Sequence, residues 1–167
     1  MLNGHDPSGQ LRGNKYTVYE AGARVPALVR WPARVAPGTV SNALVSHVDL
    51  FASFAGLLEA RLPRGAAPDS QGALEAWLGE DPVGRDYVIA QANNRALSVR
   101  TAEWKYIEPS NGPLSYSWAP GIELGFLSQP QLFDLLSDPA ERHNVATHHP
   151  DTAARLHAIL SMERSRD

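Results

Sequence analysis

Residues 96–107 read ALSVRTAEWKYI, and the predicted sheet is centred on this stretch. It contains two runs, 96–100 and 104–107, in which branched and aromatic side chains of the kind that favour strands recur. Only the three residues of 101–103 separate them, a connection short enough for a hairpin. The stretch therefore predicts two neighbouring antiparallel strands.

Further elements flank this hairpin on both sides. Residues 87–90 and 131–135 are also β-prone, and Pro150 followed by Asp151 has the pattern of a helix N-terminus. One apolar face of that helix is formed by Ala153, Leu156, Ile159 and Leu160. We expect an α+β architecture, in which residues 85–135 form a small antiparallel four-stranded sheet and the C-terminal helix covers one of its faces.

The N-terminal half has a different character. Residues 1–15 are rich in Gly, Asn, Asp, Ser and Pro and predict a loop, whereas 25–31, with the letters VPALVRW, predict a short buried strand. Residues 46–58 predict an amphipathic helix, and 74–78 a brief helical piece.

The helix at residues 46–58 carries an N-terminal signal of its own. Ser46 followed by Asp49 resembles a capping box, so His47 and Asp49 are interpreted as a helix cap rather than as a metal-ligand pair. A Pro/Gly-rich segment over 62–72 precedes a boundary expected near residue 80, which divides the chain into 1–80 and 81–167.

Composition excludes several classes of partner. The chain has 167 residues, 20% of them charged, with a formal net charge of -3, a pI near 6.0 and no Lys/Arg run. The sequence therefore does not predict a basic surface that would bind nucleic acid or an anionic membrane. We find neither a span-length apolar segment nor a secretory signal at the amino end, and the compartment stays unknown. The absence of cysteine excludes disulfides and a thiol nucleophile.

A family resemblance is carried by residues 11–26, which read LRGNKYTVYEAGARVP. The lysine, the glutamate five residues later and the following Gly, Arg and Pro resemble a signature of the sulfatases. The stretches 30–51, 99–107 and 131–146 are also similar to that family, in the same order. The chain is identified as the C-terminal part of an arylsulfatase-type sulfatase, a family within the alkaline phosphatase superfamily.

The resemblance implies sulfuric ester hydrolysis and assigns a role to Lys15. Sulfatases use a formylglycine nucleophile, made from the first residue of a [Cys/Ser]-x-Pro-x-Arg motif, and a calcium ion with oxygen ligands. Lys15 resembles the family's sulfate-binding lysine, whose charge would stabilise a sulfuryl oxygen as negative charge develops on it. We therefore take Lys15 as the candidate catalytic residue.

Two further site residues follow from the same resemblance. Asn3 resembles the amide of the family's Asp-Asn-Gly calcium motif, but Leu2 stands where the aspartate is expected, and Met1 coincides with the break. We expect that the chain begins within this motif and does not bind calcium tightly. His5, close in sequence to both Asn3 and Lys15, is a candidate contact to the substrate.

The nucleophile motif itself is missing. Residues 128–132 and 137–141 have its Ser and Pro but lack the Arg. We expect that the chain alone is inactive, that its partner is an N-terminal sulfatase segment, and that the complete enzyme takes a sulfate ester as its substrate. Without that segment, exposed apolar surface could cause self-association. The alternatives are a non-catalytic binding or assembly module and a fragment of a related phosphohydrolase, against which the Lys15 motif argues.

Four further residues are interpreted from their positions. Glu20 and Arg24 are four residues apart and predict a structural ion pair that braces the loop. Tyr116 and Trp118 lie in the long Gly/Pro-rich segment 108–130 and could line a substrate entrance.

Overall fold

The computed structural model describes residues 3–118 and 121–166. The chain divides into two compact units. The sheet unit consists of residues 1–26 and 89–167, and the helical unit of residues 27–88. These units are groups of mutually contacting residues, and a domain boundary near residue 80 stays a prediction.

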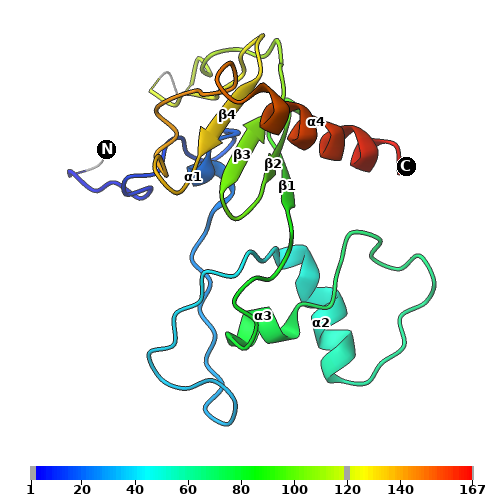
Figure 1. Ribbon diagram of the computed structural model, residues 1–167. Helices are drawn as coiled ribbons and strands as arrows, with labels where there is room; N and C mark the ends of the chain where they lie inside the picture. The colour runs from blue at the N-terminus through cyan, green and yellow to red at the C-terminus, as the bar shows by residue number, and fades with distance from the viewer. Residues whose placement is uncertain (1–2, 119–120, 167) are drawn as a thin grey trace. The chain divides into compact units, whose positions relative to one another are not determined.

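The sheet has four strands in the order in which they occur along the chain (Figure 1). They are β1 (Val88–Gln91), β2 (Leu97–Arg100), β3 (Trp104–Ile107) and β4 (Gln131–Asp134). β2 pairs with β3 and β3 with β4 in antiparallel register. The predicted hairpin and the predicted four-stranded sheet are confirmed.

The two faces of the sheet contact different parts of the chain. Side chains alternate along a strand, so the register places Lys105 on one face, opposite Arg100 and Phe133 on the neighbouring strands. We call this the loop face, because the segment 11–24 packs on it. The other face, which includes Tyr106, packs against the C-terminal helix and is called the helix face.

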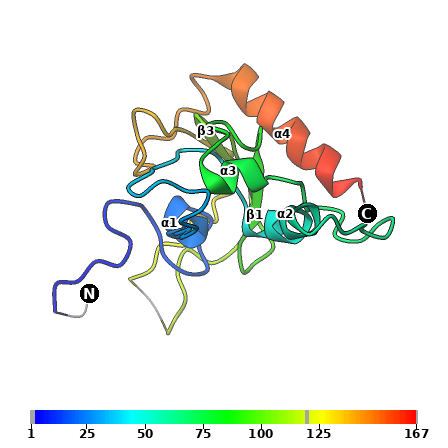
Figure 2. The same ribbon diagram turned by 90° about the horizontal axis from the view of Figure 1, so that it is seen from below.

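The C-terminal helix α4 (Pro150–Arg164) begins with its proline in the first turn, as the sequence predicts. It contacts β2 and β3, and Figure 2 shows it running alongside the sheet. Leu156 and Leu160 of this helix are buried, and its His157 meets the ring of Tyr106 at a centroid distance of 5.9 Å. The prediction that this helix covers one face of the sheet is confirmed.

The main apolar cluster of the sheet unit joins the segment 11–24 to the sheet and to the long segment 108–130. Its buried members are Val18, Tyr19, Ala92, Ala96, Ile107, Leu124, Phe126, Phe133 and Leu135. Because these residues come from distant parts of the sequence, the position of the segment 11–24 on the sheet is fixed by tertiary packing rather than by local structure.

The helical unit contains η1 (His47–Asp49), α2 (Leu50–Leu57) and α3 (Leu74–Leu78). The capping box between Ser46 and Asp49 forms, which confirms the interpretation as a helix cap. Asp49 is fully buried and binds the guanidinium of Arg85 through both carboxylate oxygens, at 2.6 and 2.7 Å. This pairing holds the pKa of Asp49 below its usual value, although burial alone would raise that pKa.

The strand predicted over 25–31 does not form. The segment lacks regular secondary structure, and no described residue pairs with it in a ladder. Leu28 is 92% exposed. An extended apolar segment becomes a strand only when another strand satisfies its backbone groups, and this segment has no such partner within the described chain.

The apolar face of α2 is likewise uncovered, with Phe51 54% and Phe54 52% exposed. An amphipathic helix is normally stabilised by burying this face against another element.

Among the described residues, no helix is long and apolar enough to cross a membrane.

Candidate functional site

The predicted catalytic residue Lys15 lies in a tight loop within the segment 11–24 of the sheet unit. Its side chain is exposed, and its Nζ lies 5.0 Å from the centroid of the Tyr16 ring. The backbone N–H groups of Lys15 and Thr17 donate to the side-chain and main-chain oxygens of Asn14, at 2.7 and 3.1 Å. The loop backbone is therefore held locally while the ammonium group remains accessible.

The glycine in the motif is required by close packing within the loop. Gly22 lies in the short helix α1 (Glu20–Ala23), and a Cβ added to it would collide with the main-chain oxygen of Thr17. Any larger residue would therefore push α1 away from the turn that carries Lys15.

Behind the loop, Glu20 is buried against the loop face of the sheet. Its carboxylate lies 3.2 Å from Nζ of Lys105 and 3.1 Å from Nε of Arg100, whereas Arg24 approaches only to 3.8 Å. The predicted pair of Glu20 and Arg24 forms, but it is the most distant of the three. Burial alone would raise the pKa of Glu20, yet Lys105 and Arg100 outweigh burial and lower it.

Glu141 is a second buried carboxylate in the same place. Its Oε2 accepts a hydrogen bond of 2.6 Å from the backbone N–H of Glu20, and its Oε1 lies 3.3 Å from Nζ of Lys105. That second contact has the distance of an ion pair but not the geometry of a hydrogen bond. Burial raises the pKa of Glu141, and the nearby charge of Glu20 adds to the increase. We call Glu20, Lys105 and Glu141 the buried triad.

Arg12 fixes the other end of the loop. Its guanidinium lies 4.1 Å from the centroid of the Tyr19 ring, and it binds the carboxylate of Glu123. The Tyr19 hydroxyl donates to Oε1 of Gln131 at 3.2 Å, and burial raises the pKa of Tyr19 to about 12. The loop is thus anchored at both ends, through Arg12 and through Glu20.

Sequence reasoning did not identify Lys105, Glu141 or Arg12 as members of this anchor. Lys105 and Glu141 lie within stretches that carry the family resemblance, but Glu20, the partner that they share, is more than eighty residues away from each along the chain. One signal was available for Lys105. Lys105 is a charged residue in a predicted strand, and its side chain lies on the same, buried face as that of Ile107, two residues later. A buried lysine needs an anionic partner, so this position predicts an ion pair.

The other two predicted site residues lie in the loop before Lys15. Asn3 and His5 are exposed, and no hydrogen bond or ion pair joins either to Lys15 in the described part of the chain. Leu2 and Met1, on which the expectation of an interrupted calcium motif depends, lie outside the described residues.

The described residues do not by themselves fit a calcium ion. Calcium takes about six to eight oxygen ligands, and Asn3 is the one candidate that the motif supplies. Across residues 3–118 and 121–166, no group of three or more His, Asp or Glu side chains is arranged to hold a metal.

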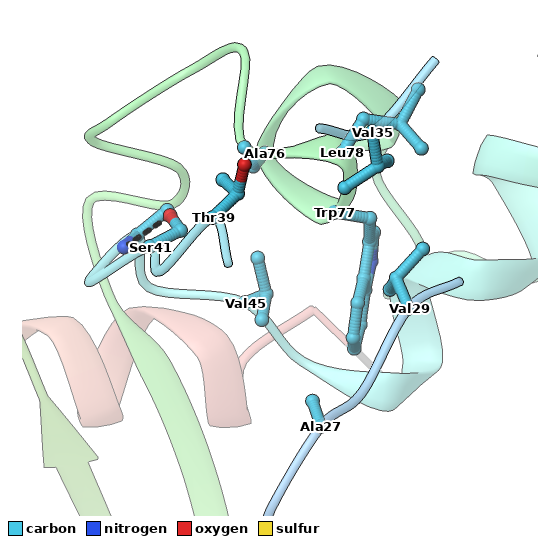
Figure 3. Close-up of a pocket in the computed structure, with 11 residues that line it drawn as sticks. Ala27, Val29, Val35, Thr39, Ser41, Val45, Ala76, Trp77 and Leu78 are labelled. Carbon is cyan, nitrogen blue, oxygen red and sulfur yellow. Dashed lines mark hydrogen bonds between the residues drawn. The ribbon is translucent and has the colours of Figure 1, made fainter. Parts of the chain in front are cut away.

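A small pocket of about 130 Å³ lies in the helical unit (Figure 3). Its walls are mostly aliphatic and include Val29, Val45 and the ring of Trp77, whose buried indole N–H has no described acceptor. The pocket contains no titratable side chain, so it offers no group for acid, base or nucleophilic chemistry.

The charge of Glu20 should make the stability of the fold depend on pH. Because its folded pKa lies below its usual value, its stabilising effect is present above the unfolded pKa of about 4.3 and is lost as pH falls through the folded pKa. We expect Glu20→Gln to lower the free energy of unfolding by about 1 to 3 kcal/mol near neutral pH. Urea unfolding near pH 7 and near pH 3.5 should show this difference shrinking in acid.

Glu103→Gln is the matched control for this prediction, because Glu103 is exposed in the turn between β2 and β3. It should have little effect at either pH. A difference for Glu20→Gln that grows as pH falls would contradict the assigned direction of the pKa shift.

Comparison with known proteins agrees with this architecture. The model of the Sulfatase family matches residues 3–60, which include the Lys15 loop. An N-acetylgalactosamine-6-O-sulfatase of Bacteroides thetaiotaomicron is 47% identical over 99% of this chain and 32% of its own length. A rat steryl-sulfatase is 31% identical over 92% of this chain and 29% of its own length.

A solved Bacteroides thetaiotaomicron structure, described with the metabolism of multiple glycosaminoglycans, superposes with a TM-score of 0.95. It is 47% identical, and the match covers 99% of this chain and 34% of that one. The chain therefore spans about a third of the length of the relatives that it matches. Its sequence, the family match and the shared fold together show that the chain belongs to the sulfatase family.

Proposed function

We propose that this chain forms part of a sulfatase that hydrolyses sulfate esters of sugars, in which Lys15 binds the sulfate group. The observation that carries the proposal is the exposed ammonium of Lys15 on a loop anchored at both ends, by Glu20 to Lys105 of the sheet and by Arg12 to Glu123 of the segment 108–130. Preorganised charge of this kind needs little rearrangement when negative charge develops on the transferring group.

The role of Lys15 would be electrostatic. Its ammonium would lie against a sulfuryl oxygen, where the negative charge increases as the sulfur–oxygen bond of the ester breaks. The Tyr16 ring, 5.0 Å away, would keep the side chain on one side of the loop by a cation–π contact. His5 is a further candidate contact, since its loop precedes that of Lys15.

The nucleophile and most of the calcium ligands would come from an N-terminal sulfatase segment. The 167 residues contain no cysteine and no Ser-x-Pro-x-Arg string, and Asn3 alone cannot hold calcium. The uncovered apolar surface of the helical unit, including Leu28, Phe51 and Phe54, supports such a partner. In its absence the same surface would promote self-association.

The substrate class is suggested by the relative that acts on N-acetylgalactosamine 6-sulfate, which is 47% identical to this chain. We propose a sulfated hexosamine as the first substrate to test. The test protein, called the complete enzyme below, joins this chain to the N-terminal segment of that relative. Sulfate release from N-acetylgalactosamine 6-sulfate would support the proposal, and a folded complete enzyme that releases none would contradict it.

The chain alone should neither hydrolyse aryl sulfates nor bind calcium tightly. The reason is the missing nucleophile motif together with the single candidate ligand, Asn3. The measurements are turnover of 4-nitrophenyl sulfate and calorimetric titration with calcium. Turnover by the purified chain that disappears in Lys15→Ala would refute the expectation, because it would show a complete site within these residues.

A further inference from the structure

Three aromatic side chains gather next to Lys15, from segments about a hundred residues apart. The rings of Tyr116 and Trp118 stack with a centroid distance of 5.3 Å and an angle of 9° between their planes. Tyr16 meets both edge-on, at 6.1 Å from Tyr116 and 5.5 Å from Trp118. We call Tyr16, Tyr116 and Trp118 the aromatic cluster.

The cluster is anchored at one end and open at the other. Tyr16 and Tyr116 pack against the main apolar cluster of the sheet unit, whereas Trp118 is 64% exposed. Tryptophan is large and apolar, and holding it in a fixed stack while it faces solvent is typical of a binding surface rather than of a core.

The backbone of Tyr16 adds an independent observation. Its φ is +79°, a left-handed conformation that is costly for a bulky side chain and that surrounding contacts must maintain. The turn from Asn14 to Thr17 and the two rings of the loop 108–130 maintain it. In this conformation the Tyr16 ring contacts both the ammonium of Lys15 and the stacked pair.

Polar groups lie at the rim of the cluster. The side-chain amide of Asn93, which is exposed, donates a 2.7 Å hydrogen bond to the hydroxyl of Tyr116. That hydroxyl keeps its own proton for donation, and the amide oxygen of Asn93 remains an acceptor. A flat apolar surface beside amide and hydroxyl groups matches a pyranose ring, which has an apolar C–H face and a hydroxyl-bearing edge. A plain aryl group would leave the polar rim unused.

We propose that Trp118 and Tyr116 form a stacking platform for the pyranose ring of the sugar whose sulfate ester Lys15 binds. This inference rests on the proposed function and adds to it the residues that recognise the sugar. Ligand sites of this kind combine aromatic walls with a few polar groups that fix orientation. The Tyr16 ring, in contact with both Lys15 and Trp118, sets the spacing between the charge and the platform.

The first test uses the 167-residue chain and needs no activity. N-Acetylgalactosamine 6-sulfate is titrated into the labelled chain while the indole N–H resonance of Trp118 is followed by NMR. We expect the sugar to shift this resonance and inorganic sulfate alone to leave it in place. Trp118→Ala, which lacks this resonance, should bind the sugar about tenfold more weakly in a calorimetric titration. Leu114→Ala is the matched control, since Leu114 is exposed in the same loop outside the cluster. A titration in which the Trp118 resonance does not move would overturn the proposal.

The second test uses the complete enzyme. Trp118→Ala should raise KM for N-acetylgalactosamine 6-sulfate by about tenfold more than KM for 4-nitrophenyl sulfate, since only the sugar uses the platform and its rim. An equal rise for both substrates would mean that the platform holds any ring and would overturn its assignment to a sugar. If the wild-type enzyme hydrolyses neither ester, the proposed function fails, and the titration of the chain alone still decides whether the platform binds the sugar.

Discussion

Replacing Lys15 with alanine should reduce kcat of the complete enzyme by roughly a hundredfold to a thousandfold. Losing one preorganised group that stabilises transition-state charge typically costs about 2.7 to 4 kcal/mol. Because Lys15 is exposed, its truncation leaves no cavity, so the melting temperature should stay close to that of the wild type. Steady-state kinetics beside a thermal melt measures both effects.

Two variants sharpen this test. Lys15→Arg should restore only part of the activity, because a planar guanidinium does not occupy the place of a compact ammonium. Arg24→Ala is a control in the same segment, since Arg24 is an exposed cation at the end of α1. It should leave kcat nearly unchanged. Near wild-type turnover of Lys15→Ala would remove Lys15 from the sulfate site.

Replacing Lys105 with methionine should destabilise the sheet unit more than Glu20→Gln does. The substitution leaves the carboxylates of Glu20 and Glu141 buried without the cation between them. Breaking a buried ion pair in this way typically costs about 3 to 5 kcal/mol. We expect this loss in the free energy of unfolding, measured with urea near neutral pH and followed by tryptophan fluorescence.

A second substitution should recover part of that loss. In the double variant Lys105→Met/Glu141→Gln, one uncompensated buried charge is removed, so the double variant should be more stable than Lys105→Met alone. Arg24→Ala serves as the control for a surface charge and should cost about 0 to 1 kcal/mol. If Lys105→Met were as mild as Arg24→Ala, the buried triad would not be what anchors the loop.

Most of the regular structure could be predicted because its signals are local. Alternation and β-prone residues in 96–107 define β2 and β3, and Pro150 with its following apolar stripe defines α4. The capping box at Ser46 is also a short-range pattern, and it forms as predicted. The strand prediction over 25–31 is wrong because a strand depends on a partner elsewhere in the chain. The segment has strand composition, but a ladder needs a second strand, which the described chain does not supply.

In the candidate site, too, local features could be predicted from the sequence and long-range contacts could not. The family, the α+β order of elements and Lys15 as the candidate residue could be predicted, because a motif and its spacing are local features of the sequence. That Glu20 is held mainly by Lys105 and Arg100, and that Tyr16 meets Tyr116 and Trp118, could be seen only in the folded chain. Those contacts join residues that are eighty or more positions apart. Burial and register select such partners from many chemically equivalent ones, so they can be identified only after the chain has folded.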